Sequence, residues 1–267
     1  MPQDYSGFLA TAIKAVREAG ALALSMQSRL KDIHFKGEKD VVTEADFACD
    51  AAIRKILTST YPQHNVITEE ADAVRMGSEF TWFVDPIDGT VNYSRGFPLW
   101  GVSVGLRQGD AMIAGAIYLP ALDELYSVTL GGGAFLNGKP IRTSPVVNLQ
   151  EAIISHGDFN IGSTDSERQE LNSRNVAARA RTAAAMQRVK CLGTAVLEGA
   201  FVAAGRMEAY CMLAMKPWDV AVAGLLVTEA GGKASRLDGS AYSIEGPDVL
   251  FSNGHLHQEL CKLLKAA

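Results

Sequence analysis

Hydrophobic residues recur every three or four positions near the start of the chain. Between Phe8 and Met26 the apolar positions follow a helical period and charged residues fill the opposite side, which predicts an amphipathic helix. A second helix is expected from Thr43 to Ser59, because Thr43 is a good N-cap residue and Tyr61-Pro62 would end it. Two helices therefore open the chain.

The period then changes to that of strands. Runs rich in β-branched and aromatic residues are expected at residues 81–84, 101–107, 112–119 and 124–130, with a hairpin turn at 108–110. Beyond residue 144, helices and strands alternate. Strands are expected at 152–155, 188–191, 207–213 and 249–251, and helices at 165–186, 194–204, 219–230 and from 255 onward. The pattern predicts a layered α/β sandwich, in which halves 1–144 and 145–267 form one compact unit.

Composition narrows the class of protein. The 267 residues are 48% apolar and carry a net charge of −5, which argues against a generally basic nucleic-acid binder. No apolar run approaches the roughly 18–20 residues of a membrane span, and we expect that Met1–Asp4 does not begin a secretory signal. The four cysteines are far apart, so we expect reduced thiols and a cytoplasmic protein without a membrane partner.

The stretch from Trp82 to Thr90 is the most informative part of the sequence. An apolar run ends in Asp85, and Asp88 follows three residues later, with Pro86 favouring an extended backbone between them. Gly89 permits close backbone approach, and Thr90 can begin a helix whose free N–H groups hold an anion. An Asp-Gly pair alone is typical of a turn, but the whole string indicates a metal and phosphate site.

Other acidic residues have ordinary structural explanations as well as chemical ones. Glu69-Glu70 could be a solvated pair, Asp46 a first-turn residue that favours the helix dipole, and Asp219 the N-cap of its helix. If they do bind metal, oxygen donors without His or Cys select Mg²⁺, or Mn²⁺, rather than zinc. The five histidines lie outside these motifs, and we expect surface or core positions for them: His34, His64, His156, His255 and His257.

Four motifs occur in the order and approximate spacing of the inositol monophosphatase family. They are Thr68-Glu69-Glu70, Asp85-Pro86-Ile87-Asp88-Gly89-Thr90, Gly193-Thr194-Ala195 and Pro217-Trp218-Asp219. The sequence resembles this family over nearly its whole length, from the segment Lys36 to Asp46 as far as Gly231-Gly232. The family comprises lithium-sensitive, Mg²⁺-dependent phosphomonoesterases. The resemblance implies an αβαβα sandwich, usually a homodimer.

The resemblance also implies roles for single residues. A first cation would be held by Glu69, Asp85 and the Ile87 carbonyl, and a second by Asp85, Asp88 and Asp219. A third, weaker cation would be held by Glu69 and, through water, by Asp46. Thr90 and Asp46 would orient the attacking water, and Glu69 would assist catalysis. Substrate contacts are expected from Asp88, Gly89, Thr90, Gly193, Thr194, Ala195, Met212 and Asp219. Two cations about 3.5–4 Å apart would promote in-line attack by water without a covalent intermediate.

The sequence departs from the family where the substrate would lie. Many members place a glutamate seven residues before the Trp-Asp aspartate, and it binds substrate hydroxyls; here that position is Met212, which cannot replace a charged acceptor. The segment Ser155 to Asn160 also differs from bacterial relatives, which makes His156 or Asp158 a candidate contact to the leaving group. The reaction is therefore better defined than the substrate.

Inositol 1-phosphate is the default substrate, and other small phosphate monoesters stay open. They are histidinol phosphate, sugar phosphates such as fructose 1,6-bisphosphate, and bisphosphate nucleotides. A non-enzymatic role bound to RNA or to the transcription machinery is a further alternative. It could use the basic residues Arg174, Arg179, Arg181, Arg188 and Lys190, although the net charge and the intact set of acidic residues disfavour it.

Overall fold

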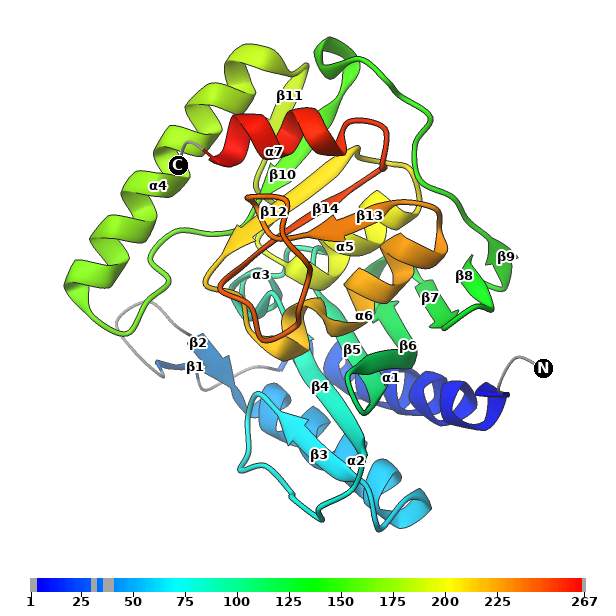
Figure 1. Cartoon of the computed structure of the whole chain (residues 1–267). Coiled ribbons are helices and arrows are strands. Elements are labelled where there is room, and N and C mark those ends of the chain that lie inside the picture. Colours follow the sequence, from blue (N-terminus) through cyan, green and yellow to red (C-terminus); the bar gives the residue numbers. More distant parts are fainter. Residues whose placement is uncertain (1–3, 30–32, 36–40, 266–267) are drawn as a thin grey trace.

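The chain folds into five layers in a computed structural model that describes residues 4–29, 33–35 and 41–265. Helices α1 (Ser6–Gln27) and α2 (Glu44–Thr60) cover the outer face of a seven-stranded sheet. Helices α5 (Ala195–Ala203) and α6 (Pro217–Glu229) lie between this sheet and a five-stranded one, and α4 (Asp165–Ala185) and α7 (His257–Lys265) cover the far side (Figure 1). The predicted αβαβα sandwich is confirmed.

The larger sheet contains every strand between residues 65 and 140. Its strands lie in the order β3-β4-β5-β6-β7-β8-β9, and every neighbouring pair is antiparallel except β3 and β4. Their bounds are β3 (Asn65–Thr68), β4 (Phe80–Asp88), β5 (Gly101–Gln108), β6 (Ala111–Leu119), β7 (Glu124–Thr129), β8 (Gly133–Leu136) and β9 (Lys139–Pro140). The short helix α3 (Thr90–Ser94) follows β4 directly, as the sequence predicts.

The smaller sheet is built after residue 152. Its order is β11-β10-β12-β14-β13, with β10 parallel to both β11 and β12, and β14 antiparallel to its two neighbours. The bounds are β10 (Ile153–His156), β11 (Arg188–Lys190), β12 (Ala209–Leu213), β13 (Lys233–Ser235) and β14 (Asp248–Ser252). A separate pair, β1 (Ile33–Phe35) and β2 (Val41–Thr43), precedes α2.

Most predicted elements lie within two residues of their expected bounds; β4 extends further, and several of the shortest strands were not predicted. Strands β1, β2, β3, β8, β9 and β13 were not predicted, because two to four residues are too few to show an alternating pattern. Met1–Gln3, expected not to begin a signal, and Lys36, where the family resemblance starts, lie outside the described residues. Within the described ranges, every helix is too short or too polar to cross a membrane.

Helix α6 lies close to the larger sheet because glycine faces it on two neighbouring strands. Gly105 and Gly115 are paired across β5 and β6, and a Cβ atom on either would stand less than 3 Å from the side chain of Val222. Val222 is buried with its neighbours in the core between the two sheets. This packing fixes the position of the N-terminal end of α6, where Asp219 lies.

Candidate active site

Two acidic residues leave adjacent parallel strands at the same edge of the larger sheet. Thr68 of β3 is opposite Val84 of β4, and the Glu69 N–H donates to the Val84 carbonyl at 3.3 Å. Glu69 and Asp85 are therefore neighbours, at the end of the strands where α/β sheets bind ligands. Asp85 is 1% exposed, and no described residue donates a hydrogen bond to its buried Oδ1.

Strand β4 does not end at Asp85, which we had expected to be its last residue. It continues to Asp88 through an irregularity: Asp85 pairs with Ser103 and Asp88 with Gly101, so β4 has one extra residue here. Gly89 follows with φ of +87°, and a Cβ there would lie 3.1 Å from both the Leu99 carbonyl oxygen and the Thr194 Cβ. The predicted close approach at Gly89 is confirmed.

Asp88 connects the two halves of the chain. Its Oδ2 accepts hydrogen bonds from the Thr194 hydroxyl at 2.6 Å and from the Val196 N–H at 2.7 Å. Val196 is the second residue of α5, so Asp88 provides the bond that an N-cap side chain usually makes, while Thr194, the actual N-cap residue, does not. The sequence carries no signal for this contact, because the partners lie 106 and 108 positions away.

Asp46 and Thr90 lie together as the sequence predicts. Asp46 is the third residue of α2, and its Oδ2 accepts from the N–H and hydroxyl of Thr43 at 2.8 and 2.6 Å. The Thr90 hydroxyl is 3.1 Å from Asp46 Oδ1 and 3.0 Å from the Ile87 carbonyl oxygen. Asp46 is thus more than a residue that favours the helix dipole, because its second oxygen is held beside Thr90.

Asp219 is not an N-cap, which corrects the expectation from the sequence. Helix α6 begins at Pro217, and Lys216 is its N-cap residue, so Asp219 is the third residue of the helix. Its Oδ2 accepts from the Lys216 N–H at 3.1 Å, the backward bond of a capping box. The reason is that proline favours the first position of a helix, where its missing N–H costs nothing.

The five acidic side chains share one electrostatic neighbourhood. Burial raises the pKa of Asp85 well above its ordinary value, and the charges of the other four, Glu69, Asp88, Asp219 and Asp46, raise it further. Burial raises the pKa of Asp88 to about 7, although its two hydrogen bonds oppose the shift. The pKa of Asp219 is also raised, first by burial and then by Asp88 and Glu69. Such a concentration of carboxylates attracts cations.

The donor atoms fit a hard divalent cation. They are carboxylate and carbonyl oxygens, and the buried Oδ1 of Asp85 lacks any other partner among the described residues. In the described part of the chain, no three His, Cys, Asp or Glu side chains already form a metal cage. Asp46, Asp88 and Asp219 each turn one carboxylate oxygen toward a hydroxyl or N–H of the chain itself.

A cavity of about 70 Å³ lies beside Asp88 and Asp219. Its lining also includes Gly193, Thr194, Ala195 and Met212, all of which were expected to contact substrate. Further lining residues are Gly157, Asp158, Glu198 and Tyr210. Glu198 and Tyr210 were not predicted from the sequence. The signal for Glu198 was an acidic residue within the otherwise apolar helix α5.

Glu198 holds the loop that precedes α5. It is completely buried and accepts from the Ser155 hydroxyl, from the Leu192 N–H at 3.0 Å and from the Thr194 N–H at 3.4 Å. Burial raises its pKa to about 8, while the same three hydrogen bonds oppose the shift. The buried side chain of Glu198 therefore holds the loop from Leu192 to Thr194 against α5.

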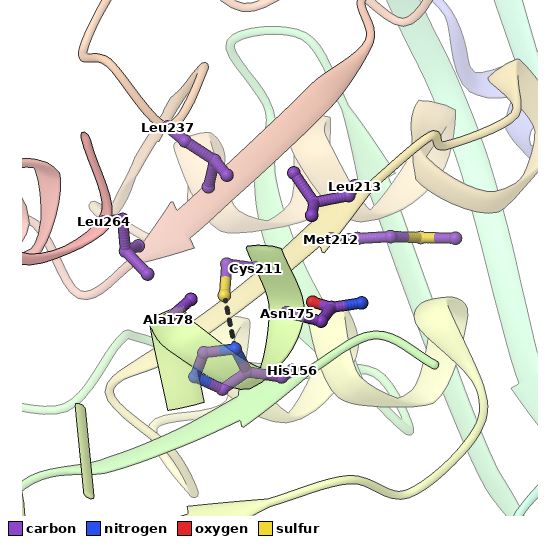
Figure 2. Close-up of a pocket in the computed structure, with 8 residues that line it drawn as sticks. All are labelled: His156, Asn175, Ala178, Cys211, Met212, Leu213, Leu237 and Leu264. Carbon is purple, nitrogen blue, oxygen red and sulfur yellow. Dashed lines mark hydrogen bonds between the residues drawn. The ribbon is translucent and has the colours of Figure 1, made fainter. Parts of the chain in front are cut away.

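His156 does not reach the cavity, so the suggestion that it contacts the leaving group is wrong. It is completely buried, with Nε2 3.0 Å from the Thr182 hydroxyl and Nδ1 3.3 Å from the Cys211 thiol. Burial lowers its pKa to about 4. Figure 2 shows His156 facing Cys211, while Met212 extends away from both, as expected of alternate residues on β12.

The expectation for the other histidines is confirmed where their side chains are described. His64 stacks between Tyr61 and Phe80, His257 is buried and hydrogen-bonded to two serines, and His255 is exposed. The side chain of His34 lies outside the described part of the structure. None of the described histidines lines the cavity beside Asp88.

Comparison with known proteins identifies the family of this chain. The inositol monophosphatase family profile matches residues 4–267. The inositol monophosphatase of Dictyostelium discoideum is 38% identical over 96% of this chain and 94% of its own length. The fructose-1,6-bisphosphatase/inositol-1-monophosphatase of Thermotoga maritima is 31% identical, covering 94% of this chain and 93% of its own. The solved inositol monophosphatase of Anabaena superimposes with a TM-score of 0.88 at 31% identity, covering 99% and 98% of the two chains.

Proposed function

This chain belongs to the inositol monophosphatase family, and from that premise we propose that it hydrolyses inositol 1-phosphate with two or three Mg²⁺ ions, which Mn²⁺ can replace. The family makes it a phosphoric monoester hydrolase, and the family is metal-dependent in general. The proposal is carried by Asp85, whose buried Oδ1 has no hydrogen-bond partner among the described residues, and by the four other carboxylates whose charges act on it.

The cation ligands follow from the motifs and their positions. We assign Glu69, Asp85 and the Ile87 carbonyl to one ion and Asp85, Asp88 and Asp219 to a second. A third, weaker ion would use Glu69 and, through water, Asp46. When bound, such cations neutralise phosphate charge and lower the pKa of water.

The chain's own residues position the reactants. The Thr90 hydroxyl, 3.1 Å from Asp46, is suited to orient a water molecule and pass a proton to the buried carboxylate. The N–H groups of Gly89 and Thr90 are suited to hold the phosphate. Because phosphoryl transfer depends mainly on positioning and electrostatics, no covalent intermediate is needed.

Fructose 1,6-bisphosphate is the second candidate substrate. The Thermotoga relative is named for both fructose-1,6-bisphosphatase and inositol-1-monophosphatase activity. In this chain Met212 stands where many family members have the glutamate that accepts hydrogen bonds from inositol hydroxyls. Histidinol phosphate and bisphosphate nucleotides would be hydrolysed by the same chemistry, so they belong in any substrate panel.

We propose a cytoplasmic homodimer that acts on a small phosphorylated substrate. The location is supported by the four cysteines, which are all free thiols. RNA binding stays disfavoured: the guanidinium of Arg179 donates to the Gly157 carbonyl, and that of Arg181 to the Leu263 carbonyl. Arg188 also donates to the Gln187 carbonyl, so three of the five basic residues considered for RNA are engaged with the chain itself.

The test replaces Asp88 or Asp219 by asparagine and assays a panel of phosphate esters with Mg²⁺. We expect kcat/KM to fall at least about 100-fold in either variant, because each removes a charged ligand. Asp110→Asn, an exposed turn residue, is the control and should keep full activity. Lithium should inhibit the wild-type enzyme. Wild-type turnover in Asp88→Asn would contradict the ligand assignment, and salt-dependent RNA retention without hydrolysis of any ester would favour the non-enzymatic role.

A further inference from the structure

We propose that Ser103 positions Asp85 for cation binding by donating a hydrogen bond from its buried hydroxyl to that carboxylate. The inference rests on the proposed function, in which Asp85 is assigned to two cations, and it adds a positioning residue that lies outside the four sequence motifs. Three features of the described residues carry it, namely the register of β4 and β5, two buried atoms without partners, and the packing that encloses Ser103.

The register of β4 and β5 places Ser103 beside Asp85. The two residues are direct partners across this antiparallel pair of strands, and the irregularity of β4 comes only after Asp85. Direct partners project from the same face of a sheet, with Cβ atoms about 4.5–5.5 Å apart. A hydroxyl on one residue can therefore reach a carboxylate on the other.

Each of the two side chains has a buried polar atom without a hydrogen-bond partner. Ser103 and Asp85 are both 1% exposed, and neither the Ser103 Oγ nor the Asp85 Oδ1 has a partner in the described part of the chain. A buried polar atom that makes no hydrogen bond is unfavourable. One group is a donor and the other an acceptor, so a turn of the carboxylate toward Ser103 satisfies both atoms with a single bond.

Glycines on either side of Ser103 let two helices approach this part of β5 closely. A Cβ on Gly101 would lie 3.1 Å from the side chain of Val196 in α5, and a Cβ on Gly105 would lie 2.7 Å from that of Val222 in α6. Residues two positions apart on a strand share a face, so Ser103 also faces the layer of α5 and α6. At 1% exposure, its hydroxyl depends on the protein for a hydrogen-bond partner.

Asp85 differs from three of the other acids in how its carboxylate is held. Asp46, Asp88 and Asp219 each accept a hydrogen bond from a hydroxyl or N–H group of the chain. Carboxylates that bind metals are usually oriented by such a second group. No described residue holds the buried Oδ1 of Asp85 in this way, and Ser103 is the hydroxyl that its strand pairing supplies.

Trp100 carries another unbonded donor near this end of β5, but it belongs to the opposite face of the sheet. Its buried Nε1 has no partner among the described residues, and its ring packs edge-on against Tyr93 with a centroid distance of 4.9 Å. Trp100 and Val102 lie in the core between the larger sheet and the helices α1 and α2. Of these two donors, Ser103 is therefore the one on the side of Asp85.

The experiment measures Mg²⁺ binding and stability in Ser103→Ala and Ser103→Cys. Isothermal titration calorimetry gives the Kd of Mg²⁺, and urea unfolding in EDTA gives the free energy of unfolding without cations. In Ser103→Ala we expect the Kd to rise about tenfold, because the cation ligand loses the group that orients it. Stability in EDTA should stay the same or increase, because the hydroxyl makes no hydrogen bond there. Cysteine is similar in size but a weak donor, so its Kd should be intermediate.

Ser252→Ala is the matched control. Ser252 is buried in β14 of the smaller sheet, and its Oγ is 2.7 Å from Nδ1 of His257. Loss of this hydrogen bond should lower the free energy of unfolding in EDTA without changing the Kd of Mg²⁺. The two serine variants are thus expected to change opposite quantities.

The outcomes separate this inference from the proposed function. A loss of stability in EDTA like that of Ser252→Ala would show a structural role for Ser103, and an unchanged Kd would show that Ser103 does not act on cation binding. Either result would overturn the inference and leave the phosphatase intact. If the wild type bound no Mg²⁺ and hydrolysed no ester, the proposed function would be overturned, and the inference with it.

Discussion

At the residue scale, Gly89 shows why the motif after β4 ends in glycine. Its φ of +87° lies in the left-handed region, and its α-carbon faces the Leu99 carbonyl and Thr194. Asp88 and Thr90, on either side, contact the second half of the chain and Asp46 respectively. Backbone conformation and close approach thus both require glycine, for reasons that bear on the site.

We predict that Gly89→Ala loses both stability and activity. The left-handed conformation and the 3.1 Å contacts should together cost about 3 kcal/mol, and displacement of Asp88 and Thr90 should lower kcat/KM at least about tenfold. Gly109 is the matched control, because its φ is +56° but a Cβ there has nothing within 4 Å. Gly109→Ala should lose only about 1 kcal/mol and keep its activity.

Urea unfolding and steady-state kinetics on the same preparations test this prediction. If the two alanine variants lost equal stability and both stayed fully active, the close packing around Gly89 would have no functional consequence. A loss of activity in Gly89→Ala but not in Gly109→Ala would show that the close contacts at Gly89 matter for activity, because both glycines share the left-handed backbone conformation.

The positions of site residues were predicted best where the residues that lie together in the fold are also close in the sequence. Asp85, Asp88 and Thr90 form a continuous string, and Asp46 is close to its N-cap Thr43, so their joint placement could be expected. Asp219 was misplaced by three positions, from the N-cap to the third residue of its helix, because proline and aspartate both mark helix starts. Glu198 was missed, since its partners Ser155 and Leu192 become neighbours only when the second half folds.

At the element scale, the N-terminal end of α5 is held by two carboxylates from different places. Asp88 binds the Thr194 hydroxyl and the Val196 N–H from outside the helix, and Glu198 binds the preceding loop from inside it. Since Thr194 does not cap the helix with its own side chain, these two acids do so together. The loop from Leu192 to Thr194 forms one wall of the cavity, so its rigidity matters for binding.

We therefore predict that Glu198→Ala impairs substrate binding while Glu198→Gln largely preserves it. Alanine leaves the Leu192 and Thr194 N–H groups buried without an acceptor, at about 1–3 kcal/mol each, so the loop should move. Glutamine keeps an acceptor of the same size. We expect KM to rise at least about fivefold in the alanine variant and less than about twofold in the glutamine variant.

Glu208 is the control, because its buried carboxylate accepts from the Ile153 N–H at 2.6 Å and it does not line the cavity. Glu208→Ala should lower the free energy of unfolding without changing KM. If KM rose equally in both alanine variants, the effect of Glu198 would reflect general loosening of the fold. The role of Glu198 as a positioning residue would then be wrong.

At the scale of the whole molecule, the acidic site joins both halves of the chain. Four of the acids, Asp46, Glu69, Asp85 and Asp88, come from the first 88 residues, whereas Asp219 lies in the first turn of a helix between the two sheets. The layered architecture could be predicted because the hydrophobic period changes along the chain. How the two sheets are placed relative to each other depends on close packing, such as that of Val222 on Gly105 and Gly115. Packing of this kind leaves no periodic pattern in the sequence, so it could not be predicted.

The protein without bound cations should become less stable as pH rises. The folded-state pKa values of Asp85, Asp88 and Asp219 are raised, that of Asp88 to about 7, above the ordinary aspartate value that they recover on unfolding. At pH values between the ordinary pKa of aspartate and the raised pKa of the folded state, the folded state therefore binds more protons than the unfolded state. The stability from these groups is fully present below the ordinary value and is lost as pH rises through about 7.

Mg²⁺ should reverse this loss, and more strongly at pH 8 than at pH 6, because it binds the deprotonated carboxylates. At a concentration 100 times its Kd, a cation stabilises the folded state by about 2.7 kcal/mol. Scanning calorimetry with Mg²⁺ or EDTA at both pH values measures the shift in Tm. In Asp85→Asn the shift should shrink at both pH values, while Asp110→Asn, exposed in a turn, should match the wild type. A shift that is absent, or larger at pH 6, would contradict a cation site built from these acids.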